Sequence, residues 1–331
     1  MNPLRIGILG CGNFANVHAK IAQGLPEQLQ LAAFCDPTEA KAKAFAEQYA
    51  PDAAVFTDHH AMFERGRLNG VIIVIPPFAH TDEVDAAAQN GIHVLIEKPI
   101  ALQADQAWAM VEAAETAGIK TQVGFMFRFG EAVEQFKALQ ASGQTGEIGL
   151  MTARYFCNAL HADWWRRRDK SGGQVVEQVI HMFDLLRYLA GDAVSVYSRQ
   201  ENLFHKDVPD YTIEDVSATI IGLKGGGMGV IYATNNAIPG KWINDYRVVA
   251  HRLTADFTNA NNAVFTHTDR EGNPVTTIES NKDYRRALLL DFVNAIRTDG
   301  VTRTPIREGA KSLDLVLAAR RSAETHGEVN V

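Results

Sequence analysis

A charged pair follows a short apolar run in the first half of the chain. Val94-Leu95-Ile96 comes after His93, and Glu97-Lys98-Pro99 follows directly. The apolar run predicts a buried strand, and Pro99 ends it because proline has no backbone N–H to donate. In open parallel α/β sheets, ligands gather outside the carboxyl ends of the strands. The sequence therefore predicts that Lys98 lies beside a bound cofactor or substrate.

A second group of polar side chains falls in a predicted helix, Val175–Ala190, which follows Gly172-Gly173. Glu177, His181 and Asp184 are spaced i, i+4 and i+7, so they share one helix face. By themselves they fit the solvent-facing side of an amphipathic helix. They also fit one wall of a site, which is the alternative that their neighbourhood favours.

Two tryptophans and three arginines lie just upstream, in Trp164-Trp165-Arg166-Arg167-Arg168. Such a patch could bind nucleic acid, but the chain has a formal net charge of -7 and no matching basic region elsewhere. Indole faces suit sugar rings and nicotinamide, and guanidinium groups suit hydroxyls or carboxylates. We therefore expect Trp165 and Arg166 to line a pocket.

A glycine-rich turn near the N-terminus predicts a dinucleotide-binding site. A predicted strand, Leu4–Leu9, leads into Gly10-Cys11-Gly12-Asn13-Phe14-Ala15, and a helix is expected over Val17–Leu25. The first glycine allows the tight turn, the second lets the backbone approach a pyrophosphate, and Ala15 permits close helix–strand packing. Backbone N–H groups at the helix start then face the phosphates.

Asp36 follows the next predicted strand, Leu29–Cys35. A carboxylate there would accept hydrogen bonds from the two ribose hydroxyls and would repel a 2′-phosphate, which favours NAD over NADP. Asp36 could also cap the predicted helix Thr38–Tyr49, with Pro37 in the first turn. The two roles can coexist.

Strands and helices alternate regularly through the first third of the chain. The later strands are expected over Val71–Ile75, Ile92–Ile96 and Thr121–Phe125, with helices over Thr81–Gln89 and Leu102–Ala117. This alternation predicts a doubly wound parallel sheet, a Rossmann domain over residues 1–123.

The rhythm changes in residues 124–331, where strands follow one another with few helices between them. This pattern predicts an α+β domain built on an open, mostly antiparallel sheet. Gly225-Gly226-Gly227 lies between two of these strands and predicts a hairpin turn. The expected strands are Leu150–Asn158, Ala193–Asn202, Val216–Leu223, Met228–Asn235 and Tyr246–Arg252. Two helices, Lys282–Thr298 and Arg307–His326, are expected to close the chain.

Composition narrows the class of protein. The acidic chain has no apolar run near the ~18 residues that span a bilayer and no signal-peptide pattern, so we expect a cytoplasmic protein with neither nucleic-acid nor membrane partners. Its three cysteines are scattered in apolar surroundings, which fits buried thiols in a reducing compartment. No cysteine or histidine spacing predicts a metal site.

Taken together, these motifs resemble the Gfo/Idh/MocA family of nicotinamide-dependent oxidoreductases over nearly the whole chain. The resemblance rests on the turn from Gly10 to Ala15, on Pro76-Pro77 with His80, on Glu97-Lys98-Pro99, and on Gly172-Gly173 leading to Glu177, His181 and Asp184. It implies a sugar, polyol or inositol dehydrogenase. The second domain would bind substrate and join subunits into a homodimer or homotetramer through its sheet.

The resemblance also implies roles for individual residues. Lys98 and His181 would be catalytic: His181 would act as base, and Lys98 would stabilise the developing alkoxide. Glu177, where the family usually has aspartate, would orient His181 or bind a neighbouring hydroxyl. Tyr284 is a weaker candidate. The cofactor, NAD with NADP as the alternative, would contact Gly10, Gly12, Asn13, Phe14, Ala15, Asp36, Pro76, His80, Glu97, Lys98, Trp165 and Arg166.

Two other functions fit the same motifs. An NAD-dependent glycosidase or lyase could oxidise a sugar transiently with the same lysine and histidine. A non-catalytic dinucleotide sensor could regulate a partner, although such a sensor needs neither Lys98 nor His181.

Overall fold

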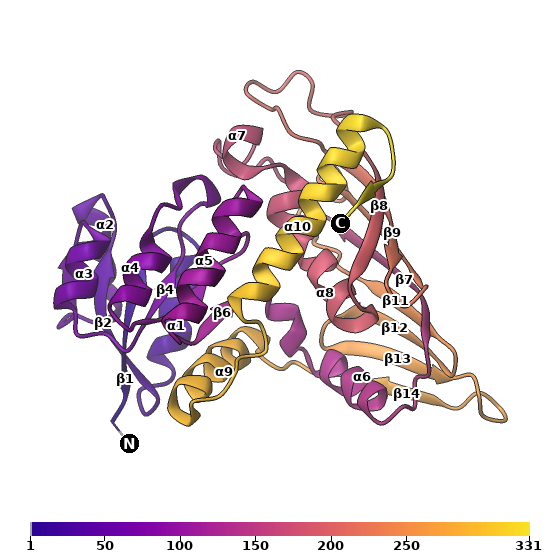
Figure 1. The fold of residues 1–331 in the computed structure, drawn as a ribbon, viewed down its shortest axis with the longest axis horizontal. Coiled ribbons are helices and arrows are strands. Elements are labelled where there is room, and N and C mark those ends of the chain that lie inside the picture. Colours follow the sequence, from indigo (N-terminus) through magenta and orange to yellow (C-terminus); the bar gives the residue numbers. More distant parts are fainter. Residues whose placement is uncertain (1) are drawn as a thin grey trace. The chain divides into compact units, whose positions relative to one another are not determined.

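The structure is a computed structural model that describes residues 2–331, and the chain forms two compact units (Figure 1). The first unit contains the chain up to Phe125 together with Arg285–Ala310. The second contains Met126–Tyr284 and Lys311–Val331. The chain therefore leaves the first unit, builds most of the second, and returns to the first before its last helix.

The first unit is built on a six-stranded sheet of order β3-β2-β1-β4-β5-β6, in which neighbouring strands run parallel. This is the Rossmann order, and the predicted fold class is confirmed. The strand order reverses between β1 and β4, which marks the switch point of the sheet. The strands are β1 (Leu4–Leu9), β2 (Leu29–Cys35), β3 (Ala54–Phe56), β4 (Gly70–Ile73), β5 (His93–Ile96) and β6 (Thr121–Val123).

Helices connect these strands as crossovers. They are α1 (Ala15–Gln23), α2 (Glu39–Tyr49), α3 (His59–Arg65), η1 (Pro77–Ala79), α4 (Glu83–Gln89) and α5 (Ala104–Thr116). β4 ends two residues earlier than the sequence predicts. Val74 N still donates to Leu9 O at 2.8 Å, but Pro76 cannot donate to the ladder, so the chain leaves the sheet before it.

The returning segment protects the β6 edge of this sheet. It contains α9 (Tyr284–Thr298) and the residues that lead into α10 (Ile306–Thr325). Val123 N donates to Thr304 O at 2.7 Å, and the Thr304 hydroxyl donates to Val123 O at 2.8 Å. Because an open strand edge invites pairing with another chain, this return closes a vulnerable edge.

The second unit is built on a nine-stranded sheet of order β14-β13-β12-β11-β7-β10-β9-β8-β15. All strand pairs are antiparallel except β7 with β10, which run parallel. The prediction of a mostly antiparallel sheet is confirmed. The predicted hairpin is confirmed: Gly226 N donates to Leu223 O and Leu223 N to Gly227 O, both at 2.9 Å. The strands are β7 (Ile148–Phe156), β8 (Ala193–Glu201), β9 (Val216–Leu223), β10 (Met228–Thr234), β11 (Tyr246–Ala250), β12 (Leu253–Asn259), β13 (Asn262–His267), β14 (Val275–Ile278) and β15 (Val329–Asn330).

Four of these strands, β12 to β15, were not predicted from the sequence. Their segments carry several threonine and asparagine residues, and their apolar stretches are short. They form because each pairs in register with a strand that is already in the sheet. In β12, for example, Ala255 is paired with Val248 on one side and with Phe265 on the other.

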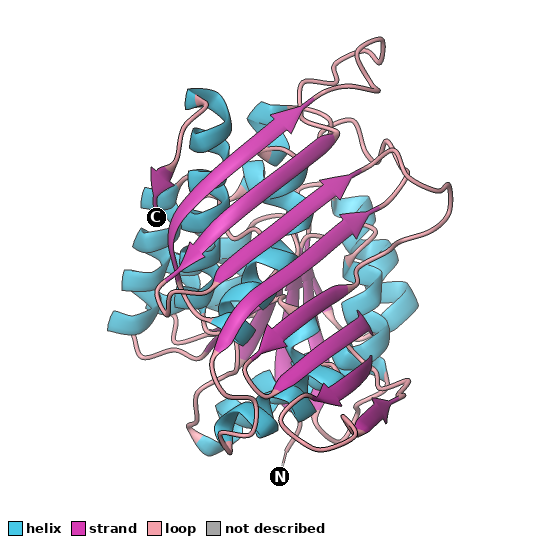
Figure 2. Cartoon of the chain, turned by 90° about the vertical axis from the view of Figure 1, so that its right-hand side faces the viewer, coloured by secondary structure: helices cyan, strands magenta, loops and turns pink. Residues whose placement is uncertain are grey.

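One face of the second sheet packs on helices, and the other is turned to the viewer in Figure 2. The helices of this unit are η2 (Met126–Phe129), α6 (Glu131–Ala141), α7 (Arg168–Ser171), the π-helical turn η3 (Val175–Val179), α8 (Ile180–Ala190) and most of α10. α8 packs closely on β7 and β10. A Cβ at Gly229 of β10 would lie 2.2 Å from a Leu186 methyl of α8, so a larger residue there would have to displace the Leu186 side chain. Of the helices in residues 2–331, none combines the length and apolar character that a membrane crossing needs.

Candidate active site

The glycine turn of the first unit has the shape that a dinucleotide requires. Gly10 has φ +90°, and a Cβ there would lie 2.4 Å from Val74 O, so the turn needs glycine. A Cβ at Gly12 would meet open space, which leaves room for a ligand. Phe14 is the N-cap of α1, and neither a side-chain cap nor an acidic residue occupies its first turn. A helix start of this kind suits a pyrophosphate, so these residues fit the cofactor.

The remaining residues of the turn divide between core and surface. Ala15 is fully buried against the strands, as close helix packing requires, whereas Asn13 and Phe14 are exposed. The exposed pair lies where a bound dinucleotide would cover it.

Asp36 is held beside this turn. Its carboxylate accepts hydrogen bonds from Cys11 N at 3.0 Å and from Thr38 N at 2.9 Å. Thr38, and not Asp36, is the N-cap of α2, so the prediction that Asp36 caps this helix is wrong. Each carboxylate oxygen keeps a further lone pair, which leaves the group able to accept from ribose hydroxyls.

Glu97 and Lys98 follow β5 directly. Glu97 receives a 2.8 Å hydrogen bond from His18 of α1, and the two side chains are largely buried. A Cβ at Gly124 would lie 2.5 Å from the Glu97 carboxylate, so glycine makes room for it. Glu97 therefore ties the end of β5 to the helix of the glycine turn. Lys98, the next residue, is partly exposed at the carboxyl end of the sheet.

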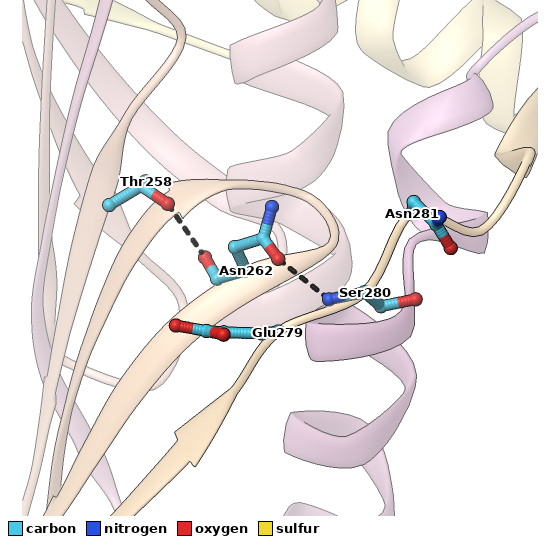
Figure 3. A pocket seen from close by; sticks show the side chains of 5 residues that line it. All are labelled: Thr258, Asn262, Glu279, Ser280 and Asn281. Carbon is cyan, nitrogen blue, oxygen red and sulfur yellow. Dashed lines mark hydrogen bonds between the residues drawn. The ribbon is translucent and has the colours of Figure 1, made fainter.

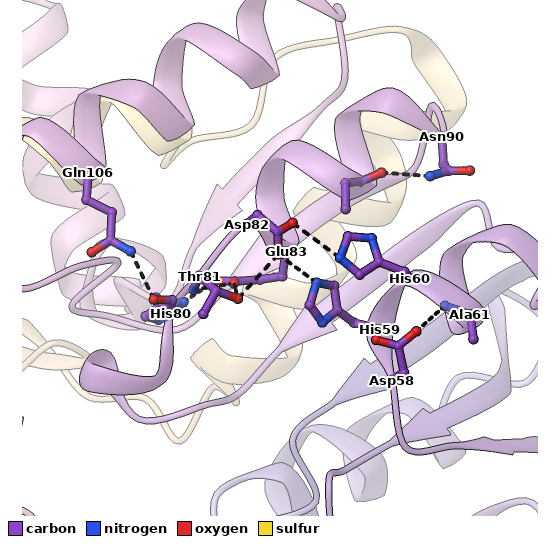
Figure 4. A network of polar contacts seen from close by, with 11 residues as sticks. Asp58, His59, His60, Ala61, His80, Thr81, Asp82, Glu83, Asn90 and Gln106 are labelled. Atoms are coloured by element: carbon purple, nitrogen blue, oxygen red, sulfur yellow. Dashed lines mark hydrogen bonds and ion pairs between the residues drawn. The ribbon is translucent and has the colours of Figure 1, made fainter.

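His80 follows η1, the short helix that begins at Pro77, directly after Pro76. A buried carboxylate fixes its side chain (Figure 4). Its Nδ1 is hydrogen-bonded to Glu83, and Glu83 also accepts from Thr81 N at 2.8 Å. Burial raises the pKa of Glu83, but the hydrogen bond and charge of His80 outweigh it and hold that pKa below its usual value. The buried His80 Nε2 has no hydrogen-bond partner among the described residues, so it is available to a ligand.

The helix that carries His181 is not an ideal α-helix. Val175–Val179 form a π-helical turn, and the α-helical part starts at Ile180. π-turns inside helices are common at functional sites because they re-aim side chains. Glu177 lies in this turn and His181 just after it, so the simple i, i+4 spacing does not describe how they point.

The solvent-facing interpretation of this helix is wrong. His181 is 6% exposed and Asp184 1% exposed. Asp184 accepts from Arg128 Nε at 2.9 Å and Nη2 at 2.6 Å, a bidentate buried pair, and from the Ser312 hydroxyl at 3.1 Å. Asp184 therefore anchors the helix. Removing one partner of such a pair leaves an uncompensated buried charge.

His181 lies in an aromatic setting. Its ring centroid is 5.1 Å from that of Phe127, which in turn lies 6.0 Å from Tyr284. Tyr284, the weaker candidate of the sequence analysis, therefore shares this cluster through Phe127.

Glu177 is held by a tryptophan. The indole Nε1 of Trp165 donates to Glu177 Oε2 at 2.7 Å, and Trp165 is 2% exposed. Its ring packs in a small core with Tyr211 and Ile213. Burial, together with the charge of Glu177, raises the pKa of the Cys157 thiol to about 12, so this cysteine is no nucleophile.

The loop before α7 is held by Arg166 and by His161 and Gln178, two residues that the sequence analysis did not single out. Arg166 Nε donates to Leu160 O at 2.9 Å, and its Nη2 to His161 O at 3.2 Å. Gln178 and His161 are joined by a 2.8 Å hydrogen bond. No spacing links His161 to Gln178 or Arg128 to Asp184, because each pair meets only through the fold.

A separate shallow pocket lies between β12, β13 and the segment before α9 (Figure 3). Ser280 N donates to the Asn262 side chain at 2.7 Å across it, and the Thr258 hydroxyl donates to Asn262 O at 3.3 Å. None of the predicted site residues lines it. The full lining is Thr258, Asn262, Glu279, Ser280 and Asn281.

The sheet order and the glycine turn define a Rossmann fold of the dinucleotide-binding class. Residues 4–125 match the model of the oxidoreductase family with an NAD-binding Rossmann fold, and residues 133–256 match the Gfo/Idh/MocA C-terminal domain. The chain belongs to the Gfo/Idh/MocA family. NAD as the class of cofactor is thereby confirmed.

The curated relatives include sugar and inositol dehydrogenases. D-glucoside 3-dehydrogenase of Escherichia coli K12 is 27% identical, over 100% of this chain and 98% of the relative. Myo-inositol 2-dehydrogenase of Thermotoga maritima is 25% identical, over 99% and 98%. Among solved structures, levoglucosan dehydrogenase in complex with NADH and L-sorbose has a TM-score of 0.92 at 18% identity, covering 100% of this chain and 99% of the other, a likeness of fold.

Proposed function

We propose that the protein is an NAD-dependent dehydrogenase that oxidises a secondary hydroxyl of a sugar, polyol or inositol. The observation that carries the proposal is the position of Lys98. It follows β5, which pairs with β4, and β4 is one of the two strands that flank the switch point where ligands of doubly wound sheets bind. The dehydrogenases named among the relatives support the substrate class.

The cofactor site would be built from two kinds of group. The glycine turn from Gly10 to Ala15 would hold the pyrophosphate, and Asp36 would accept from the adenosine ribose. A carboxylate at that position disfavours a 2′-phosphate, which supports NAD over NADP. The cofactor would also contact Pro76, His80 and Glu97. His80 Nε2 would donate a hydrogen bond to the cofactor or accept one from it. The nicotinamide ring, when bound, supplies the hydride acceptor.

The catalytic work would fall to three side chains. His181 would take the hydroxyl proton as the general base. The Lys98 ammonium would stabilise the alkoxide charge that develops as the hydroxyl is oxidised. Glu177, held by Trp165, would orient the imidazole or bind an adjacent hydroxyl, with Trp165 and Arg166 shaping the pocket.

The test is the variant Lys98→Ala. NAD binding is expected to remain while turnover falls by roughly 10²–10³, the usual cost of losing one charge-stabilising donor. Lys241→Ala, at an exposed position of the second unit, serves as the control. A panel of inositols, aldoses and lactones, followed by NADH absorbance, identifies the substrate. Near-normal turnover by Lys98→Ala would remove this lysine from the mechanism.

The same panel separates the alternative functions. A dehydrogenase accumulates NADH together with an oxidised product. A glycosidase or lyase that re-reduces its intermediate would release sugar without net NADH, and a sensor would bind NAD without turning over any member of the panel.

We also propose that the second sheet joins two copies of the chain. Its solvent-facing side carries apolar residues in register, such as Tyr197 opposite Ile220 across β8 and β9. Such a surface marks an interface. Ile220→Glu is expected to convert a dimer or tetramer to a monomer in light scattering, whereas a monomeric wild type would refute the proposal. The exposed apolar set includes Tyr197, Ile220, Met228, Tyr232, Val249 and Val264.

A further inference from the structure

Two histidines and an aspartate of the first unit, none of them assigned to the cofactor above, converge on one spot (Figure 4). His59 and His60 open α3, and Asp82 precedes α4. His59 Nε2 lies 3.0 Å from one oxygen of Asp82, and His60 Nε2 lies 3.2 Å from the other. All three ligand-type atoms lie within 4.8 Å of one another.

These separations are close to those around a metal ion. Zinc binds imidazole nitrogen and carboxylate oxygen at roughly 2.0–2.2 Å, so two ligands of a tetrahedral ion lie about 3.3 Å apart. The two nitrogen–oxygen distances of 3.0 and 3.2 Å therefore need only small side-chain adjustments to admit an ion. A fourth position would be left for water, as in other three-ligand sites.

The side chains are held in this arrangement without a ligand. The His59 and His60 rings lie 4.3 Å apart at an interplanar angle of 31°, and His59 also packs against Phe63 at 5.8 Å. Asp58 accepts from Ala61 N at 2.8 Å and so fixes the start of the helix that presents both rings. Less conformational freedom is then lost when an ion binds.

The donors are also accessible and suitably charged. The side chains of His59, His60 and Asp82 are 19%, 51% and 53% exposed, so an ion can reach them from water. Asp82 supplies an acidic oxygen ligand, and the two imidazoles supply nitrogen ligands.

We propose that His59, His60 and Asp82 form a binding site for a divalent transition-metal ion of the zinc type. Two imidazoles and one carboxylate favour zinc, cobalt or nickel over magnesium and calcium, which prefer oxygen ligands. The ion would join the start of α3 to the start of α4. Because Asp82 lies between His80 and Glu83, the ion would stiffen the segment that fixes His80. This role is structural and separate from hydride transfer.

The experiment uses the full-length protein without a histidine tag, stripped of metal with a chelator. Titration with cobalt is expected to give one equivalent of bound ion with the visible absorption bands of cobalt–imidazole coordination. Zinc is expected to displace the cobalt and to raise the unfolding temperature, because an ion that binds only the folded state stabilises it.

Three variants give the comparison. His60→Gln and Asp82→Asn are expected to weaken cobalt binding at least tenfold, because each removes one of three ligands. His251→Gln, an exposed histidine of the second unit, is expected to bind as the wild type does. The unfolding temperatures of the metal-free variants check that each one folds.

Two results would overturn the proposal. One is equal cobalt affinity in all four proteins, which would place the ion elsewhere. The other is no binding at millimolar cobalt, which would leave the cluster as a polar contact between two helices. Neither result bears on the proposed dehydrogenase activity, because that activity is tested at Lys98.

Discussion

The two candidate sites are built in different ways. In the first unit, continuous stretches of chain supply the site: a turn whose backbone faces the ligand, and residues at the ends of neighbouring strands. In the second, side chains from distant segments lock one another, as Trp165 locks Glu177 and Arg128 locks Asp184. The site of the first unit should be lost when an added side chain fills the space that a glycine leaves open. The site of the second unit should be lost when a hydrogen-bond partner of one of its side chains is removed. Variants of the two units should therefore have different effects on cofactor binding, stability and turnover.

The largest effect is expected at His181. His181→Asn removes the base, and losses from removing a general base are typically 10²–10⁴-fold in turnover. NAD affinity, measured by calorimetry, is expected to stay unchanged because His181 is not among the residues proposed to contact the cofactor. If this variant lost NAD affinity as well, the assignment of separate tasks to the two units would be wrong.

The next effect tests the glycine turn by filling space. Gly10→Ala is expected to cost about 2–4 kcal/mol of unfolding free energy, from the positive φ and the contact with Val74 O. Gly12→Ala is the matched control, since its added methyl meets open space in the protein. It should keep the stability, measured by denaturant unfolding, and lose NAD affinity. Equal stability of the two variants would contradict this account of the turn.

A smaller effect is expected at Asp36. Asp36→Asn keeps an acceptor for Cys11 N but loses the charge that disfavours a 2′-phosphate. The ratio of NADP to NAD efficiency should rise by roughly ten- to a hundredfold, the value of a hydrogen bond to a charged group. Steady-state kinetics with both cofactors measure it. An unchanged ratio would show that Asp36 does not select the cofactor.

The smallest effect is expected at Trp165. Trp165→Phe keeps an aromatic ring in the core and removes the indole N–H that holds Glu177. Turnover should fall about tenfold, and its pH profile should shift. The reason is that the loss of a hydrogen bond to a carboxylate costs roughly 1–3 kcal/mol. In a protein that already carries Glu177→Gln, the further change Trp165→Phe should leave the pH profile unchanged. A drop in stability with an unchanged pH profile in the single variant would make Trp165 a packing residue only.

Several features of the first unit could be predicted because they depend on local sequence. The turn from Gly10 to Ala15 is recognisable from residue size and spacing, and Pro99 ends a strand because of its own chemistry. The sequence also predicted the change to an antiparallel sheet after residue 124. It did not predict β12 to β15, which form by pairing with neighbouring strands of the second sheet.

Other features could not be predicted because they join residues far apart in the chain. The tie between His18 and Glu97 is one example, because it links the residue after β5 to α1. The meeting of His59 and His60 with Asp82 is another, since adjacent histidines alone predict no metal site. Nor did the pattern around His181 reveal a π-helical turn.

The sequence by itself determined the class of this protein: a dinucleotide fold, a strand-end lysine and a helix-borne histidine, all written in short motifs whose backbone geometry follows from residue type. Only the tertiary structure decided which polar groups are buried, what holds them, and that residues 285–310 return to complete the first unit. The reason is physical, because local conformation depends on neighbouring residues, whereas burial and pairing depend on segments that meet only after the chain has folded.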